Sequence, residues 1–149
     1  MVLHWMVATL HLLALPLGLG SILVRARAFG GSLDRAGLLT LFRADTLWGL
    51  SALVWISTGV WRAFFGLEKG TPYYLASNAF WAKMSFLLVI LALEIAPMIT
   101  LIRWRLLSGR GQAPDTARAL TYARLSAIQS GLVVFMVFAA TAMARGWFY

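Results

Sequence analysis

Four long runs of apolar residues, separated by short polar connections, make up most of this chain. None of the runs alternates between apolar and polar positions as a strand of a membrane barrel does. A helix needs about 20 residues to cross a hydrocarbon core roughly 30 Å thick, and each run reaches that length. Only helices and closed barrels satisfy the backbone in lipid, so the pattern predicts four transmembrane helices. The apolar runs cover residues 3–24, 46–65, 80–101 and 125–144.

The connections between the runs carry signals that set the ends of the predicted helices. The Pro-Asp-Thr segment at 114–116 is typical of a helix start, so the fourth helix is expected over 117–145. Asn78 is suited to cap the third helix. The latter half of the first connection is either an interfacial turn or an extension of the second helix. Short connections favour an all-α, antiparallel four-helix transmembrane bundle, forming a single domain over 1–149.

Composition and charge agree with a membrane protein and exclude several other classes. The chain is 61% hydrophobic and 12% charged, with a mean hydropathy of +0.80. Soluble domains are nearer half apolar and a quarter charged. The net charge of +8 does not indicate a nucleic-acid partner, because the arginines gather in short connections beside the apolar runs. The absence of cysteine excludes a disulfide framework, a thiolate metal site and covalent haem attachment.

The distribution of charge predicts how the chain lies in the lipid bilayer. The first connection holds four arginines against two aspartates, and the third holds five arginines against one aspartate. The positive-inside rule places these connections in the cytoplasm and both termini on the opposite side. Tryptophans are expected in a belt at each interface. They are Trp5, Trp61, Trp81 and Trp147 at the outer ends of the runs, and Trp48 and Trp104 at the inner ends.

Two ionisable residues, Lys83 and Glu94, interrupt the third apolar run. A carboxylate at the depth of Glu94 costs roughly 3 kcal/mol unless a partner or a proton neutralises it. We therefore expect Glu94 either to pair with a cation or to stay protonated and hydrogen-bond to Gln129 or His11. At about 1.5 Å per residue, the polar residues fall into two layers of similar depth. The outer layer contains His11, Arg62 and Lys83, and the inner layer contains Glu94, Gln129, Asp45 and Arg124.

His11 is the strongest candidate for a metal ligand. A neutral imidazole at mid-depth in a membrane can hold haem iron, and the alternative is a histidine hydrogen-bonded within the bundle. Lys83 either extends toward the interface or lines a pocket. Arg124 belongs either to a structural ionic cluster or to a site.

The sequence also resembles a known family. Segments 43–49, 59–64, 66–71 and 80–84, which read RADTLWG, GVWRAF, GLEKGT and FWAKM, carry the resemblance. They are similar to an uncharacterised family of small bacterial membrane proteins, catalogued as the domain of unknown function numbered twenty-two fourteen. The resemblance covers nearly the whole chain and implies four spans in a bacterial inner membrane. With the orientation above, both termini are then periplasmic.

A more remote similarity is to the HemJ-type protoporphyrinogen oxidases and the copper-resistance CopD proteins. His11 resembles the histidine of their first helix, the segment from Trp81 to Lys83 resembles the motif that opens their third, and Arg124 stands where an arginine opens their fourth. The resemblance implies b-type haem, with His11 as metal ligand and Lys83, Glu94 and Arg124 as further cofactor-binding residues. Glu94 occupies the position of a second histidine in HemJ-like proteins, so the chain departs from their bis-histidine pattern and from the oxidase activity that goes with it.

Three functions are compatible with these residues. The first is a polar pocket inside the membrane that binds a small ligand or a redox cofactor such as haem b. The second is a non-catalytic accessory subunit of a larger membrane complex, or a homo-oligomer. The third is proton-linked transport that uses Glu94. The sequence has no glycine-rich phosphate loop and no H-E-x-x-H motif, and whether the protein is an enzyme is left open.

Overall fold

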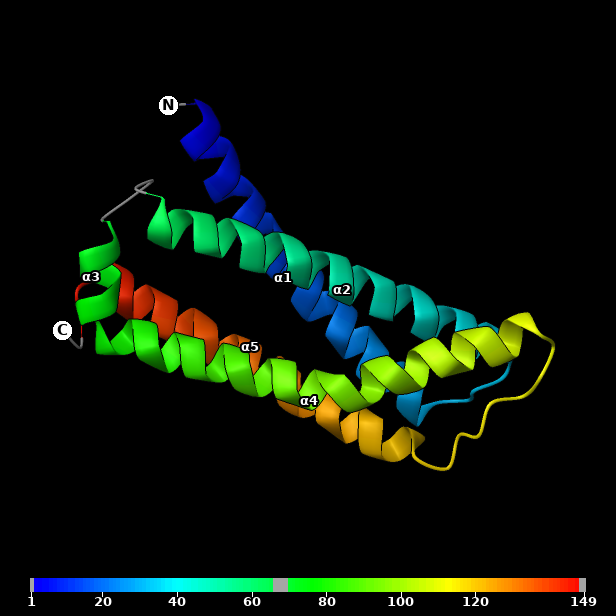
Figure 1. The fold of residues 1–149 in the computed structure, drawn as a ribbon. Helices are drawn as coiled ribbons and strands as arrows, with labels where there is room; N and C mark the ends of the chain where they lie inside the picture. The colour runs from blue at the N-terminus through cyan, green and yellow to red at the C-terminus, as the bar shows by residue number, and fades with distance from the viewer. Residues whose placement is uncertain (1, 66–69, 148–149) are drawn as a thin grey trace.

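The computed structural model describes residues 2–65 and 70–147, and over these ranges the chain forms helices and their connections (Figure 1). Each of the four long helices is long and apolar enough to cross a membrane. This confirms the predicted all-α membrane fold with four spans. The long helices are α1 (Val2–Gly30), α2 (Arg35–Phe64), α4 (Asn78–Gly109) and α5 (Ala119–Ala144), and α3 (Thr71–Ala76) is short.

Several helices extend past the apolar runs at the end that carries the basic connections. The latter half of the first connection is an extension of α2, which begins at Arg35. Asp34 caps this helix, because its side chain accepts a hydrogen bond of 2.8 Å from the backbone N–H of Gly37. The predicted start signal before the last helix forms a turn, in which Asp115 accepts from the N–H of Ala117. The helix α5 itself begins two residues later than the predicted position 117.

The prediction that Asn78 caps the third span is wrong. Asn78 is the first residue of α4, and Ser77 occupies the N-cap position with an extended backbone. The reason is the unpredicted helix α3, which ends at Ala76 and leaves a single residue to join it to α4. Gly70 precedes α3 with a φ of 83°, a conformation that favours glycine, and Pro72 lies in its first turn.

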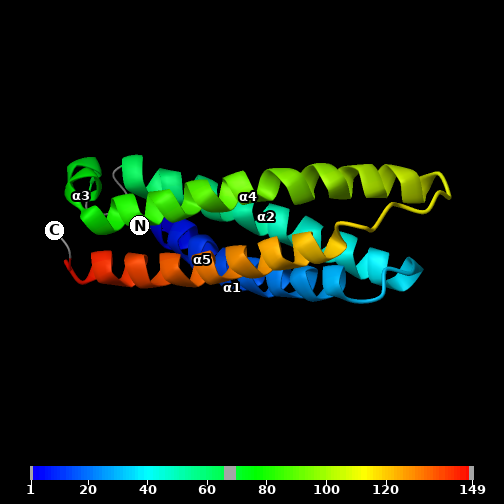
Figure 2. The same ribbon diagram turned by 90° about the horizontal axis from the view of Figure 1, so that it is seen from below.

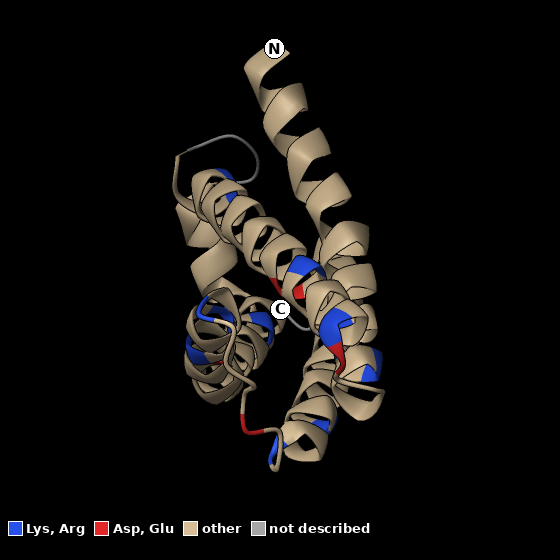
Figure 3. Cartoon of the chain, turned by 90° about the vertical axis from the view of Figure 1, so that its right-hand side faces the viewer, with Lys and Arg blue, Asp and Glu red and all other residues tan. Residues whose placement is uncertain are grey.

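Successive long helices run in opposite directions, and the start of α1 and the end of α5 lie at the α3 end of the bundle (Figure 1). We call this the outer end and the opposite end, which carries the connections 31–34 and 110–118, the inner end. Helix α5 packs against both α1 and α4, and α1 also packs along α2 (Figure 2). The first turns of α1 project away from the other helices (Figure 3).

Three apolar clusters follow one another along the bundle and form its core. The inner cluster consists of Phe29, Leu41, Leu101, Trp104, Ala119 and Tyr122. The middle cluster consists of Ile22, Trp48, Ile90, Val133 and Met136. The outer cluster consists of Ala63, Tyr74 and Phe80. Many other large apolar side chains are exposed, as expected for helices whose outer surfaces face lipid.

Close packing of α1 on α2 depends on Gly18. A Cβ atom added at Gly18 would lie 3.3 Å from the Cβ of Ser51 and 3.6 Å from Cζ3 of Trp48. Small residues let the backbones of two membrane helices approach closely. This close packing matters because lipid supplies no hydrophobic force between the helices. Gly20, two positions further along the same helix, has no atom within 4 Å of such a Cβ.

Replacing Gly18 with leucine is expected to separate α1 from α2 and to lower the free energy of unfolding by about 1–3 kcal/mol. Gly20→Leu is the matched control and is expected to change it by less than about 0.5 kcal/mol, since its side chain would face outward. Unfolding in mild detergent, followed by circular dichroism, measures both values. Equal losses at the two positions would contradict the packing described here.

Candidate functional site

A buried ion network joins the four long helices in the inner half of the bundle. Its centre is Arg25 of α1, whose side chain is fully buried. The guanidinium Nη1 and Nη2 atoms donate to Oε1 and Oε2 of Glu94 on α4 at 2.6 and 2.7 Å. Nη1 also donates to Oδ1 of Asp45 on α2 at 3.0 Å. Paired bonds between an arginine and a carboxylate are among the strongest hydrogen bonds in proteins, so Arg25 ties α1 to α4.

Helix α5 completes the surroundings of Arg25. Nε of Arg25 donates to Oγ of Ser126 at 3.2 Å, and Nη2 donates to Oε1 of Gln129 at 3.0 Å. The amide nitrogen of Gln129 donates in turn to Oε2 of Glu94 at 2.7 Å and to the carbonyl oxygen of Ile90 at 3.1 Å. Each nitrogen of the buried guanidinium therefore has an acceptor, and Glu94 receives bonds from two helices.

Arg105 closes the network toward the inner end. Its Nη2 atom donates to Oδ2 of Asp45 at 2.7 Å and to the carbonyl oxygen of Phe42 at 2.8 Å. The side chain of Arg105 is 38% exposed, whereas that of Arg25 is 0% exposed. Two arginines thus face two carboxylates, and the network carries no net charge. Of the two alternatives left open for Glu94, pairing with a cation is the one observed.

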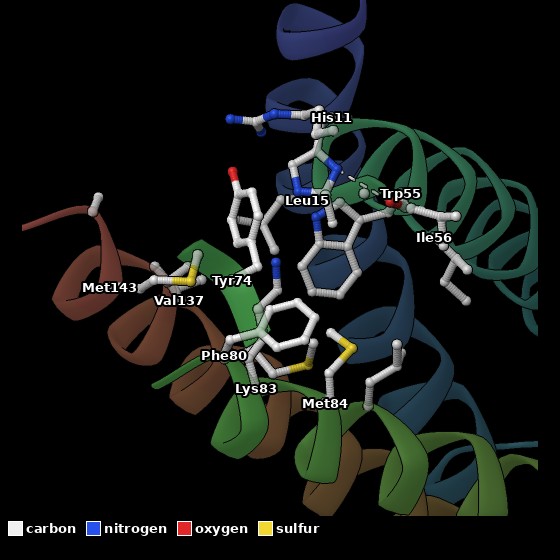
Figure 4. Close-up of a pocket in the computed structure, with 18 of the residues that line it drawn as sticks. His11, Leu15, Trp55, Ile56, Tyr74, Phe80, Lys83, Met84, Val137 and Met143 are labelled. Carbon is white, nitrogen blue, oxygen red and sulfur yellow. Dashed lines mark hydrogen bonds between the residues drawn. The ribbon is translucent and has the colours of Figure 1, made fainter. Parts of the chain in front are cut away.

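A cavity of about 400 Å³ lies at the outer end, lined by side chains from all five helices (Figure 4). Most of its lining is apolar or aromatic, and a few polar groups converge on it. Among the residues that line it are His11, Trp55, Arg62, Tyr74, Lys83 and Met84. This cavity is called the outer pocket below.

His11 is held in a defined orientation on the wall of the outer pocket. Its Nδ1 atom lies 3.1 Å from the carbonyl oxygen of Trp55 and 2.9 Å from Oγ1 of Thr58. The carbonyl can only accept, and the Thr58 hydroxyl donates to the carbonyl of Val54, so Nδ1 carries the proton. In the neutral ring Nε2 is then the acceptor.

Neighbouring residues shape the space around the imidazole. The ring stacks on Trp55 with centroids 5.6 Å apart and an angle of 29° between the planes. A Cβ atom at Gly59 would lie 3.2 Å from Cε1 of His11, so the absence of a side chain there makes room for the ring. Lys83 extends into the pocket from α4, with Nζ 5.8 Å from the centre of the Trp55 ring (Figure 4).

A hydrogen bond joins α3 to the end of α5. The hydroxyl of Tyr73 donates to the carbonyl of Met143 at 2.9 Å.

The middle apolar cluster separates the outer pocket from the ion network. Met136 of this cluster lines the pocket, together with Trp55, which packs against the cluster. On the other side of the cluster, Trp48 lies over the guanidinium of Arg25 with its ring centre 5.8 Å away. The carbonyl of Ile90, also in the cluster, accepts from Gln129. The two polar regions are therefore distinct sites.

The structure divides the residues that the sequence predicted for a single cofactor site. His11 and Lys83 line the outer pocket, together with Arg62. Glu94 lies instead in the ion network. Arg124 is exposed and belongs to neither. It stands two positions before Ser126 on α5, and two residues turn a helix by about 200°, so the two side chains point to opposite sides.

Sequence reasoning missed Arg25, which it counted among the charges of the first connection. A signal was present in the spacing, because His11, Gly18 and Arg25 follow one another at intervals of seven residues. This spacing keeps them on one face of a helix. All three are buried on α1. A basic residue that continues the buried face of a span is a candidate for an internal ion pair.

These features define an α-helical integral membrane protein with a neutral internal ion network and a separate pocket. A family model described as "Predicted membrane protein (DUF2214)" matches residues 3–147, so the chain belongs to this family. No curated protein and no solved structure matches the chain. The more remote resemblance to HemJ- and CopD-type proteins stays a prediction.

Glu94→Leu is expected to lower the free energy of unfolding by about 3–5 kcal/mol, because it leaves Arg25 buried without its main counter-charge. The double variant Arg25→Met, Glu94→Leu is expected to recover much of this loss, since Asp45 keeps its bond to Arg105. Unfolding in detergent measures both variants.

Arg124→Gln is the control, because it removes an exposed arginine from the same half of the bundle. We expect it to change the free energy of unfolding by less than about 0.5 kcal/mol. A double variant no more stable than Glu94→Leu alone would show that the loss does not come from an unpaired buried charge.

Proposed function

We propose that this protein binds a small ligand inside the membrane, in the outer pocket. The observation that carries the proposal is the cavity of about 400 Å³ on which His11, Arg62 and Lys83 converge. Ligand sites typically occupy roughly 300–1,000 Å³ and combine an apolar lining with a few oriented polar groups. Polar side chains inside a membrane are costly and are therefore usually retained for function.

Haem b is the specific cofactor that the sequence resemblance suggests for this pocket. Histidines that bind metals commonly donate their other ring N–H to a backbone carbonyl, and Nδ1 of His11 is placed to do so toward Trp55. His11 would then hold the iron through Nε2, while Arg62 and Lys83 would bind the propionates. Haem would supply one-electron redox chemistry. In this proposal Glu94 and Arg124 take no part in the cofactor site.

If haem b is the ligand of the outer pocket, purified protein supplemented with haemin is expected to show a Soret band. His11→Ala is expected to abolish the band by removing the axial ligand. His4→Ala is the control, because His4 lies on the same helix but is exposed, and it should leave the band unchanged. A spectrum without a Soret band, or one that survives the loss of His11, would refute haem binding in the outer pocket.

A second candidate is a subunit of a homo-oligomer or of a larger membrane complex. It is favoured by the first turns of α1, which project from the bundle (Figure 3). Val2, Leu3 and Trp5 in this part of α1 are well exposed. Proton-linked transport through Glu94 is less favoured, because its carboxylate is bonded to Arg25 and Gln129 and behaves as a fixed counter-ion.

We also propose that the protein resides in a bacterial inner membrane, with the inner end in the cytoplasm and both termini in the periplasm. Most of the arginines lie toward the inner end, which faces the viewer in Figure 3. Short cytoplasmic connections of membrane proteins are enriched in these residues. The outer pocket then faces the periplasmic side.

Single cysteines test this orientation directly, because the chain has none of its own. In intact spheroplasts, a membrane-impermeant maleimide is expected to label Trp147→Cys and to leave Ser32→Cys and Gln112→Cys unlabelled. All three positions are exposed at the ends of the bundle. After the membrane is opened, all three should react. The reverse pattern in intact spheroplasts would overturn the orientation.

A further inference from the structure

We propose that the ligand of the outer pocket is an anionic amphiphile, which enters sideways from the bilayer. Its phosphate or carboxylate group would lie at Arg62 and Lys83, and its chain would fill the deeper, apolar part of the cavity. This inference rests on the proposed role of the outer pocket as a ligand site, and it names the class of ligand.

The rim of the pocket indicates entry from the lipid. Leu12 of α1 and Val60 of α2 line the cavity, yet they are 65% and 47% exposed. Both belong to helices that can span the membrane, so their exposed surfaces face hydrocarbon. A molecule dissolved in the bilayer can therefore reach the cavity past apolar side chains without crossing water.

The two cations indicate the charge of the ligand. Arg62 and Lys83 come from different helices, α2 and α4, and both line the same largely apolar cavity. Positive side chains held in surroundings of low polarity attract an anion more strongly than they would in water. Arginine in particular offers a planar set of donors that fits a phosphate or a carboxylate.

The order of polar and apolar groups matches the orientation of a membrane amphiphile. Arg62 lies in the last turn of α2 and Lys83 in the second turn of α4, so both are close to the outer end. Deeper in the cavity the lining includes Leu15, Leu87 and Met136, which belong to or pack against the middle apolar cluster. An amphiphile of the outer leaflet already has its head group outward and its chain inward, and it can enter without turning over.

Quenching of tryptophan fluorescence by brominated amphiphiles tests the proposal, because Trp55 forms part of the pocket wall. The full chain in neutral detergent is titrated with a dibrominated fatty acid and with a brominated lysophosphatidic acid. We expect saturable quenching that the unbrominated compounds reverse. Trp55→Phe is expected to lose the saturable component, whereas quenching of lipid-facing tryptophans is non-saturable.

Charge variants show whether the anionic group is recognised. The double variant Arg62→Gln, Lys83→Gln is expected to weaken binding at least roughly tenfold, as loss of charge-assisted hydrogen bonds predicts. Lys83→Arg should keep most of the affinity, which guards against a loss caused by misfolding. Arg145→Gln is the matched control, because Arg145 is exposed near the outer end and does not line the cavity. Equal weakening by Arg145→Gln would overturn the inference.

Two further probes separate the chemical sources of the anion. A brominated alcohol of the same chain length is expected to bind much more weakly than the acid, and inorganic phosphate is expected not to displace the acid at equal concentration. Displacement by phosphate alone would overturn entry from the bilayer. If the amphiphiles fail to bind while haemin gives a Soret band that depends on His11, the inference falls and the proposed function stands. If neither binds, both fall.

Discussion

The structure depends on neutralising one buried guanidinium. Arg25 is fully enclosed, and a charge in that position is tolerated only when each of its donors is bonded and its charge is balanced. Glu94, Asp45 and Gln129 meet these requirements from three different helices. Since the geometry of these bonds is narrow, the network fixes how far along the bundle α1, α2, α4 and α5 lie relative to one another.

The outer pocket lies at the end of the bundle away from the ion network. Where the helices are joined through Arg25 they stay together, whereas toward the outer end α1 departs from the bundle (Figure 1). The middle apolar cluster bounds the outer pocket toward the inner end. Helix α3, which Tyr73 joins to α5 through a hydrogen bond, bounds it on one side. The same chain thus holds a largely buried ion network and a separate cavity with polar groups on its wall. The two regions therefore lie at different depths and contain different residues.

Hydropathy alone was sufficient to predict the helical fold and its four spans, because lipid leaves the backbone few alternatives. Depth along the runs also grouped His11 with Lys83, and Glu94 with Gln129. Depth could not identify Arg25 as the centre of an internal ion network. A charge at the end of an apolar run resembles an interfacial arginine until its partners are known. Helix α3 was missed since a six-residue helix after Gly70 depends on contacts with neighbouring helices rather than on a periodic pattern. Depth also does not describe rotation about the helix axis, which places the side chain of Arg124 on the exposed side of α5.

The order of residues in the ion network has a consequence for how the protein is made. Arg25 leaves the ribosome 69 residues before Glu94, its main partner, and 104 before Gln129. While only the first span has been inserted, the arginine is best accommodated among lipid head groups, which its long side chain can reach. It becomes internal when the third and fourth spans arrive and replace those contacts. The hydrogen bonds that enclose Arg25 can therefore be completed only after the second half of the chain has been synthesised.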